Sequence, residues 1–300
     1  MTSLGTVAVD LGKSLCRVRI SIAGRVVHRE GPGAPGLAAR DGDRLALDAI
    51  LALLEPRDPR AAVRIGVGAA GVLFAPDAGA AFATALSEAA EAPVAVASDV
   101  VTAHAGALGG EGGVLLVAGT GAVALGVDRD GYRSVDGWGP ELGDLGSGSW
   151  IGREGVRAVL RARDGLAGPT ALAEALARLI GGDETPIAWV GRSAAVPRLL
   201  ATFAPAVLDS ADREDPAALA IRDRAAELLA DTARAAARPH GAVALHGGLM
   251  SHPGFRSAVT AALAARGLEA RESRGDALDG AAMIAEGRAP LHERFVHRAG

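Results

Sequence analysis

The sequence has little cysteine: Cys16 is the only one in 300 residues. A single thiol excludes an internal disulfide, a Cys-x-x-Cys redox motif, a four-thiolate zinc site and an iron–sulfur cluster held by one chain. Any metal chemistry must therefore use oxygen ligands.

Basic clusters and long apolar runs are also missing. Lys13 is the only lysine, the net charge is −4 and hydrophobic residues make up 49% of the chain. This balance is typical of a soluble globular protein and argues against nucleic-acid binding through a basic surface. The longest charge-free stretch, 112–127, is too short and too rich in glycine to span a bilayer. Because the N-terminus shows no secretory signal either, we expect a cytoplasmic protein without a membrane partner.

Length and hydrophobic patterning predict two domains of one α/β kind. A chain of 300 residues can form two ordinary domains. Short runs rich in valine, isoleucine and alanine indicate strands, and apolar residues at three-and-four spacing indicate helices. In the first half the predicted strands are 6–10, 16–22, 25–29, 63–67 and 94–97, and the predicted helices are 45–54, 79–90 and one that opens after Asp99.

The second half repeats this order around a helical insertion at about 150–238. We therefore predict an N-terminal domain of residues 1–108 and a C-terminal domain of residues 109–300, with ligands in a cleft between the two copies. The predicted strands of the second half are 113–118, 122–127, 132–135, 243–246 and 268–272, with helices at 255–265 and 276–285. The insertion has predicted helices at 150–163, 169–180 and 216–238, joined by turn-rich connections at 181–196 and 208–215.

Two segments look like nucleotide motifs of other folds. Gly12-Lys13-Ser14 matches the end of a P-loop, but Val7 stands where the first glycine should be, and a strand follows instead of a helix. The segment 66–71 matches Gly-x-Gly-x-x-Gly after a strand, yet an apolar run follows where a dinucleotide-binding helix should begin. A dinucleotide site there is the weaker alternative.

A first candidate phosphate turn lies between two predicted antiparallel strands, in Asp10-Leu11-Gly12-Lys13-Ser14. A carboxylate at a strand end can hold a magnesium ion through water, and turn amides can bind phosphate oxygens. Taken alone, the segment is more typical of an ordinary hairpin turn.

A second candidate turn occupies the matching place in the second half. Gly119-Thr120-Gly121 offers close backbone approach and a hydroxyl donor to a phosphate. Two such turns at corresponding places in two repeats favour a nucleotide ligand.

Ser98-Asp99 ends an apolar strand and opens a helix. The pair is either a helix N-cap or a general base for a hydroxyl nucleophile, with Asp99 as the base. The sequence alone leaves both interpretations open.

The most distinctive stretch is 137–154, in which closely spaced glycines surround Asp144. This pattern favours a backbone folded tightly around a small polar ligand. The alternative is a solvent loop that caps the next helix, which does not explain why Trp138 and Asp144 occur together. Gly247-Gly248, after a strand, can let an adenine or ribose lie against backbone or can be a plain strand-to-helix turn. Lone histidines such as His104 and His246 are interpreted as packing or surface residues.

Together these motifs resemble the sugar kinase/Hsp70/actin superfamily, in particular its N-acetylglucosamine kinase branch, grouped with BadF/BadG/BcrA/BcrD-type ATPases. Nearly the whole chain is covered by this resemblance. Its most specific part is Gly137-Trp138-Gly139 followed by 143–147 and 150–152, which is similar to the GWG…GDEGS…WIG segment of the family. The segment 10–12 is similar to its first phosphate motif, 119–121 to its second and 247–248 to its adenosine motif.

The resemblance implies two actin-like (ribonuclease H-like) domains with mixed sheets flanked by helices and an interdomain cleft. It further implies ATP and Mg²⁺ as cofactors and phosphorylation of an amino-sugar hydroxyl, with the 6-hydroxyl as the expected acceptor. Asp99 would be the catalytic base and would also contact the sugar, and Asp10 would hold magnesium through water. The phosphates would lie against Gly12, Lys13, Ser14, Gly119, Thr120 and Gly121, the adenosine beside Gly247 and Gly248, and the sugar against Gly137, Trp138, Gly139 and Asp144.

Departures from the family pattern concern the sugar more than the chemistry. Leu145 replaces the glutamate of GDEGS, Ala122 and Val123 replace polar residues, and the loop 31–36 lacks the asparagine often found there. The alternatives are an activator ATPase that shares an iron–sulfur cluster between subunits, and a regulatory sugar sensor without turnover. A homodimer is the default expectation for the oligomeric state.

Overall fold

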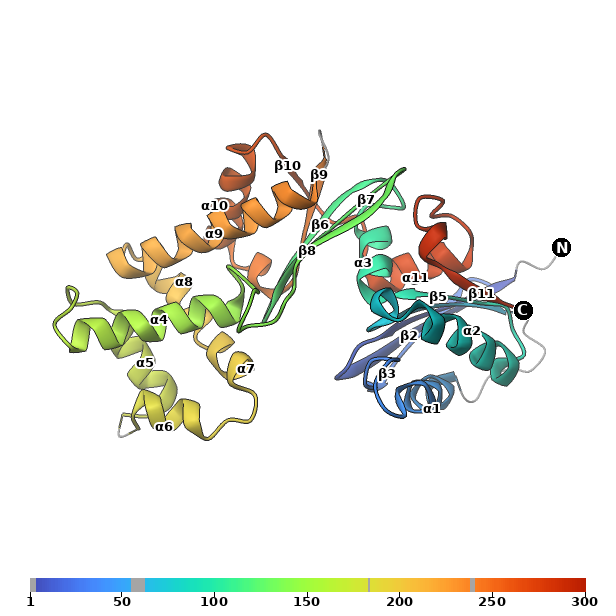
Figure 1. Cartoon of the computed structure of the whole chain (residues 1–300), viewed down its shortest axis with the longest axis horizontal. Coiled ribbons are helices and arrows are strands. Elements are labelled where there is room, and N and C mark those ends of the chain that lie inside the picture. The colour runs from blue at the N-terminus through green and yellow to red at the C-terminus, as the bar shows by residue number, and fades with distance from the viewer. Residues whose placement is uncertain (1–3, 55–62, 183, 238–240) are drawn as a thin grey trace. The chain divides into compact units, whose positions relative to one another are not determined.

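The computed structural model describes residues 4–54, 63–182, 184–237 and 241–300. The chain forms two compact units (Figure 1). Unit 1 comprises residues 1–112, 127–131 and 272–300, and unit 2 comprises residues 113–126 and 132–271. Each unit has a mixed sheet flanked by helices, which confirms the predicted fold class.

The sheet of unit 1 has the strand order β11-β5-β4-β1-β2-β3. The first three strands pair antiparallel through tight turns, whereas β1, β4 and β5 run parallel. The three parallel strands are rich in valine and alanine because helices cover both of their faces. The bounds are β1 Gly5–Leu11, β2 Leu15–Ile22, β3 Arg25–Pro32, β4 Val63–Ala69, β5 Val94–Ser98 and β11 His297–Ala299.

Alternating side chains of β1 face different helices, as the two-residue period of a strand requires. Val7 and Val9 belong to the core cluster that includes residues of α1 and α2, whereas Ala8 packs with residues of α11. Figure 1 shows α1 and α2 on one side of this sheet and α3 and α11 on the other. These helices span Gly42–Leu54 (α1), Pro76–Ala90 (α2), Asp99–Ala107 (α3) and Ala277–Ala285 (α11).

Helices α3 and α11 pack so closely that small residues are required between them. A Cβ atom at Gly280 of α11 would overlap the carbonyl oxygen of Thr102, and one at Gly106 of α3 would overlap that of Asp276. A Cβ atom at Gly66 of β4 would likewise overlap the carbonyl oxygen of Ala281. The helix that begins at Asp99 is therefore in direct backbone contact with α11, and α11 is in direct backbone contact with β4.

We expect Gly280→Ala to destabilise the protein by about 1–3 kcal/mol, because the added methyl group forces the two helix backbones apart. This loss opposes the gain of about 1 kcal/mol that alanine brings to a helix interior. Urea denaturation measures the shift in free energy of unfolding. Gly191→Ala is the matched control, since a Cβ atom at this helical position meets nothing within 4 Å. Equal stability of the two variants would contradict the prediction.

A buried histidine pair joins α3 to the C-terminal segment. His104 Nδ1 lies 2.8 Å from His292 Nε2, and both residues are fully buried. The Nδ1 atom of His292 has no hydrogen-bond partner among the described residues. Burial, with a further contribution from His104, lowers the pKa of His292 from 6.5 to about 3.

The free energy of unfolding should therefore decrease as the pH drops below 6.5. The reason is that His292 binds a proton near pH 6.5 in the unfolded chain but only near pH 3 in the folded chain. The expected loss from this residue is about 2 kcal/mol at pH 5 relative to pH 7 or above. Melting temperatures between pH 7 and pH 5 measure it, with His292→Leu as the comparison. A wild-type pH slope in the variant would disprove the role of His292.

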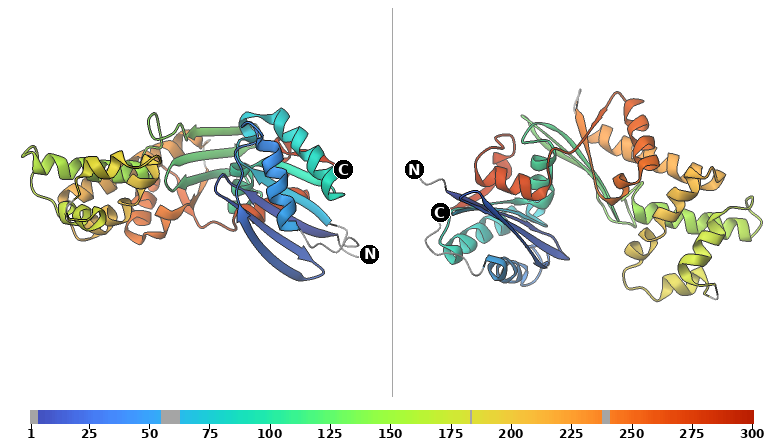
Figure 2. Two further views of the ribbon diagram at one scale, coloured as in Figure 1. Left: turned by 90° about the horizontal axis from the view of Figure 1, so that it is seen from below. Right: turned by 180° about the vertical axis from the view of Figure 1, so that it is seen from behind.

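The sheet of unit 2 has the order β10-β9-β6-β7-β8, in which β6, β9 and β10 run parallel. Its strands are β6 Gly113–Ala118, β7 Ala122–Asp128, β8 Gly131–Asp136, β9 Ala242–His246 and β10 Glu269–Arg271. Its helices, yellow-green to orange-red in Figure 2, share one hydrophobic core with β6, β7 and β9. They are α4 Gly148–Arg163, α5 Leu172–Ile180, α6 Pro186–Gly191, α7 Val196–Ala201, α8 Ala204–Asp212, α9 Pro216–Ala236 and α10 Pro253–Ala264.

Two details of the helical insertion differ from the sequence-based expectation. The predicted turn-rich connections at 181–196 and 208–215 are wrong where α6 and the end of α8 lie. Both helices carry proline in their first turn, and the hydroxyl of Thr185 caps α6, so local signals for a helix start were present. The predicted helix 216–238 ends at Ala236, and residue 238 lies outside the described residues.

The C-terminal segment belongs to a different unit than the predicted domain division assigns it to. That division places all of 109–300 in one domain, whereas residues 272–300 are part of compact unit 1. Strand β11 pairs antiparallel with β5, with His297 opposite Val96. The pairing partner of such a short edge strand is decided by tertiary contact and not by local pattern. None of the described helices combines the length and apolar character that a membrane span needs.

Candidate functional site

The first predicted phosphate turn joins β1 to β2 in unit 1. It is a hairpin turn, as the simpler interpretation predicts: the amide of Gly12 donates to the carbonyl of Leu15 at 3.0 Å. The carbonyl of Gly12 in turn accepts from the amide of Ala34 at 3.2 Å. The side chains of Lys13 and Ser14 are exposed, so they are accessible to a ligand.

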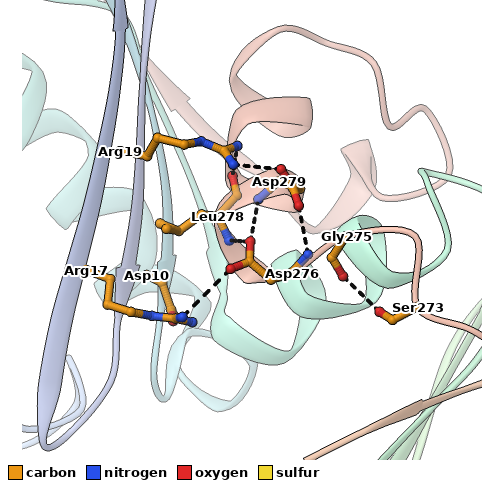
Figure 3. Close-up of polar contacts among 8 residues, drawn as sticks. All are labelled: Asp10, Arg17, Arg19, Ser273, Gly275, Asp276, Leu278 and Asp279. Carbon is orange, nitrogen blue, oxygen red and sulfur yellow. Dashed lines mark hydrogen bonds and ion pairs between the residues drawn. The ribbon is translucent and has the colours of Figure 1, made fainter. Parts of the chain in front are cut away.

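Asp10, at the end of β1, is held by the arginine directly opposite on β2. The Nη2 and Nε atoms of Arg17 donate to Oδ2 of Asp10 at 2.6 and 3.1 Å (Figure 3). The sequence analysis missed Arg17, although a hairpin with its turn at 12–14 pairs positions 10 and 17. Opposite charges at paired positions of adjacent strands would have been the signal.

Arg17 and Arg19 also connect this sheet to the start of α11 (Figure 3). Arg17 lies 3.7 Å from a carboxylate oxygen of Asp276, and Arg19 donates to Asp279 at 2.7 Å. The two aspartates form a capping box, in which each carboxylate accepts the backbone amide of the other. Although burial raises the pKa of Asp279, hydrogen bonds from Asp276 and Arg19 outweigh it and hold that pKa below its usual range.

The predicted catalytic base, Asp99, is the first residue of α3 and directly follows β5. Its Oδ1 atom accepts two hydrogen bonds, from the Ser98 hydroxyl at 2.9 Å and the Val100 amide at 2.8 Å. Oδ2 accepts none from the described part of the chain. Ser98 stands at the N-cap position, but its side chain makes no capping hydrogen bond, so the N-cap interpretation is wrong for its hydroxyl.

The second predicted turn lies between β6 and β7 in unit 2 and is fixed by the start of α4. The carbonyl of Gly119 accepts from the amide of Gly148 at 2.8 Å, and that of Thr120 accepts from the amide of Ser149 at 3.1 Å. The Thr120 side chain is exposed, so its hydroxyl remains available to a ligand.

Asp144 contacts this turn, so the structure brings together two motifs that are more than 20 residues apart. Its Oδ1 atom accepts from the amide of Ala122 at 3.1 Å. A Cβ atom at Gly121 would lie 2.9 Å from both carboxylate oxygens of Asp144, which explains the glycine. Burial raises the pKa of Asp144, the Ala122 amide opposes this, and Asp136 and Glu141 raise it further.

Asp136 organises the glycine-rich loop and was missed by the sequence analysis. Its carboxylate accepts the amides of Gly137, Asp144 and Leu145 at 2.8, 2.7 and 2.9 Å. Asp136 and Asp144 both have left-handed backbone angles, with φ of 63° and 53°. An aspartate immediately before the glycines, where strand β8 ends, was the available signal.

Gly247 brings the end of β9 against the end of β6. It has a φ of 104°, and a Cβ atom there would overlap the carbonyl oxygen of Ala118. A Cβ atom at Gly248 would meet nothing within 4 Å, so that face is open to a ligand. The predicted adenosine residues thus lie next to the residue that precedes the Gly119-Thr120-Gly121 turn.

Comparisons with known proteins identify the family of this chain. Residues 30–285 match the BadF/BadG/BcrA/BcrD ATPase family. The chain belongs to this family. Its membership confirms the predicted family, in the actin-like ATPase fold, and implies ATP as the nucleotide.

Individual relatives of this ATPase family member are named as sugar kinases. The structure of a candidate N-acetylglucosamine kinase from Chromobacterium violaceum is 30% identical, with a TM-score of 0.75, over 95% of this chain and 100% of that one. The N-acetyl-D-glucosamine kinase of Dictyostelium discoideum is 41% identical over 78 residues, which are 26% of this chain and 24% of that protein. The chain thus spans about a quarter of that relative. A ROK family glucokinase from Streptomyces griseus, 20% identical over 94% of this chain and 99% of that one with a TM-score of 0.54, shares the fold.

The described side chains fit a magnesium ion only if waters and the phosphates of a bound nucleotide supply most of its ligands. No group of three or more metal-ligating side chains occurs in the described ranges. Asp10 offers one carboxylate oxygen, Oδ1, because Arg17 occupies Oδ2. Since Mg²⁺ is commonly held by one or two carboxylates together with waters and substrate phosphates, Asp10 fits a magnesium ion held through water.

Proposed function

We propose that this ATPase family member is a sugar kinase that transfers the γ-phosphate of ATP to the 6-hydroxyl of an amino sugar such as N-acetylglucosamine or glucosamine. The observation that carries the proposal is the hydrogen bonding of the Asp99 carboxylate: Oδ1 accepts from two donors, and Oδ2 is available. A fixed carboxylate at a strand end is suited to remove a proton from a hydroxyl. Two relatives named as N-acetylglucosamine kinases support this substrate class.

In the proposed reaction, the sugar hydroxyl oxygen attacks the γ-phosphorus, the bond to the β-phosphate oxygen breaks, and ADP leaves. Asp99 accepts the hydroxyl proton. Such a reaction depends mainly on positioning and on neutralising phosphate charge, part of which magnesium supplies when it is bound. Asp10 would hold that ion through water, as the available Oδ1 atom allows.

Backbone groups and small side chains would bind the rest of ATP. In unit 1 the turn at Gly12, Lys13 and Ser14 would contact the phosphates, and in unit 2 the Thr120 hydroxyl and the amides of its flanking glycines would do so. Gly247 and Gly248 would border the adenosine, where the open face of Gly248 supports this role.

Asp144 would bind the sugar together with Gly137, Trp138 and Gly139. The Trp138 side chain is 71% exposed, so it is available to a ligand and does not serve as packing for the loop. The carboxylate of Asp144 also accepts the Ala122 amide through Oδ1, which fixes its position beside the turn at 119–121.

The competing activator-type role requires a thiolate that can ligate a cluster. Cys16 is fully buried, and burial, with a smaller contribution from Asp10, raises its pKa to about 12. A thiol in this environment is unsuited to bind iron at neutral pH. A regulatory sugar sensor without turnover is the remaining alternative.

Magnesium-dependent ADP release from ATP tests the proposal. The acceptors are N-acetylglucosamine, glucosamine, N-acetylmannosamine, N-acetylmuramic acid and glucose, with mass spectrometry of the sugar phosphate and Asp99→Asn as the blank. Stimulation by an amino sugar, lost in the variant, supports the kinase. No stimulation by any sugar overturns it, and iron bound by anaerobically purified protein would favour the activator role. Light scattering on the same sample determines whether the protein is a homodimer.

A further inference from the structure

The hydroxyl of Ser98 makes an unusual hydrogen bond for a residue at a helix N-cap. Serine at an N-cap commonly accepts a hydrogen bond from one of the first free amides of its helix. In α3 the Ser98 side chain makes no such bond. Its hydroxyl instead donates to Oδ1 of Asp99 at 2.9 Å. The residue is 3% exposed, so the hydroxyl is shielded from water that would compete for it.

Three contacts together determine where the carboxylate of Asp99 points. The Val100 amide donates to the same Oδ1 atom at 2.8 Å. The hydroxyl of Thr102, which is fully buried, donates to the backbone carbonyl of Asp99 at 2.9 Å. Thr102 thus helps to hold the backbone of Asp99, whereas Ser98 and Val100 hold its side chain. Oδ2 is left as the oxygen that can accept a proton.

We infer that Ser98 is a positioning residue that keeps the carboxylate of Asp99 turned with Oδ2 available to the acceptor hydroxyl. The inference rests on the proposed function, since it assigns Ser98 a task only if Asp99 is the base. A general base must lie within hydrogen-bond reach of the proton that it removes, and a hydrogen bond from a fixed neighbour restricts rotation of the carboxylate. The hydroxyl of Ser98 supplies this restraint in addition to the Val100 amide.

Ser98→Ala tests the inference, because it removes the hydroxyl and almost no volume. We expect kcat to fall about tenfold, as for the loss of one hydrogen bond to a charged group, with KM for sugar and for ATP within about twofold of wild type. Ser98→Thr, which keeps the hydroxyl, should retain most of the activity. Ser87→Ala is the matched control, because it removes the hydroxyl of another buried serine of unit 1, which donates to the carbonyl of Ala92 at 2.8 Å and not to Asp99; its kcat should stay near that of wild type.

The combination with Asp99→Asn separates positioning from a structural effect. If Ser98 acts through the carboxylate, Ser98→Ala should lower kcat no further once Asp99 is asparagine. An unchanged kcat in Ser98→Ala, or an equal loss in both backgrounds, overturns the inference while the kinase assignment stands. Absence of sugar-dependent ADP release in the wild-type protein overturns the proposed function and with it the inference.

Discussion

An Asp99→Asn variant should fold like the wild-type protein and lose about 10²–10⁴ in kcat, the range usual for removal of a general base. Asparagine has nearly the same shape, and its side-chain oxygen can still accept from the Ser98 hydroxyl and the Val100 amide. The atom at the position of Oδ2 becomes an NH₂ group, which cannot take the proton of the acceptor hydroxyl. The variant therefore keeps the side-chain volume at position 99 but loses the proton acceptor.

Steady-state ADP release and the melting temperature should be measured on the same preparation of this variant. Asp48→Asn is the matched control, since Asp48 is an exposed aspartate on α1 of the same unit, paired with Arg44. The control should retain wild-type kcat. Turnover near the wild-type value in Asp99→Asn would remove Asp99 from the mechanism, whatever the acceptor.

Asp144→Ala should raise KM for the sugar about 100-fold and change KM for ATP by less than about threefold. A charged hydrogen-bonding group that contacts a ligand hydroxyl contributes on the order of 1.5–3 kcal/mol to binding, which corresponds to roughly 10- to 150-fold. Asp144 is half-buried, so its carboxylate is partly withdrawn from water, where such a contact is stronger.

Two further variants define the cause of this effect. Asp144→Asn can still accept the Ala122 amide, so it keeps the phosphate turn in place and tests the carboxylate charge alone. Asp164→Asn, at the exposed end of α4, is the control for a distant charge change in the same unit. A KM for sugar that is unchanged in Asp144→Ala, or a KM for ATP that rises equally, would assign the glycine-rich loop to another role.

The fold was predictable where one local pattern decides it. Strands β1 to β3 have alternating or continuous apolar residues between tight glycine-containing turns. The turns at 12–14 and 119–121 also lie between the strands that the sequence predicts. Helices α6 and α8 were missed because their segments are rich in turn residues and because helices of six to nine residues depend on tertiary packing for stability. Strand β11 was missed because three residues carry no usable period.

By itself, the sequence determined the family of the protein and identified its candidate site residues, which are the aspartates at strand ends and the glycine-framed turns. The tertiary structure decided how those groups are held. Arg17 occupies one oxygen of Asp10, Asp136 holds the loop of Asp144 through backbone amides, and Ser98 donates to Asp99 instead of capping its helix. The return of residues 272–300 to unit 1 was decided in the same way. The reason is physical: residue type and short-range period are local properties of a chain, whereas a hydrogen-bond partner is selected by whichever donor the folded backbone brings within about 3 Å.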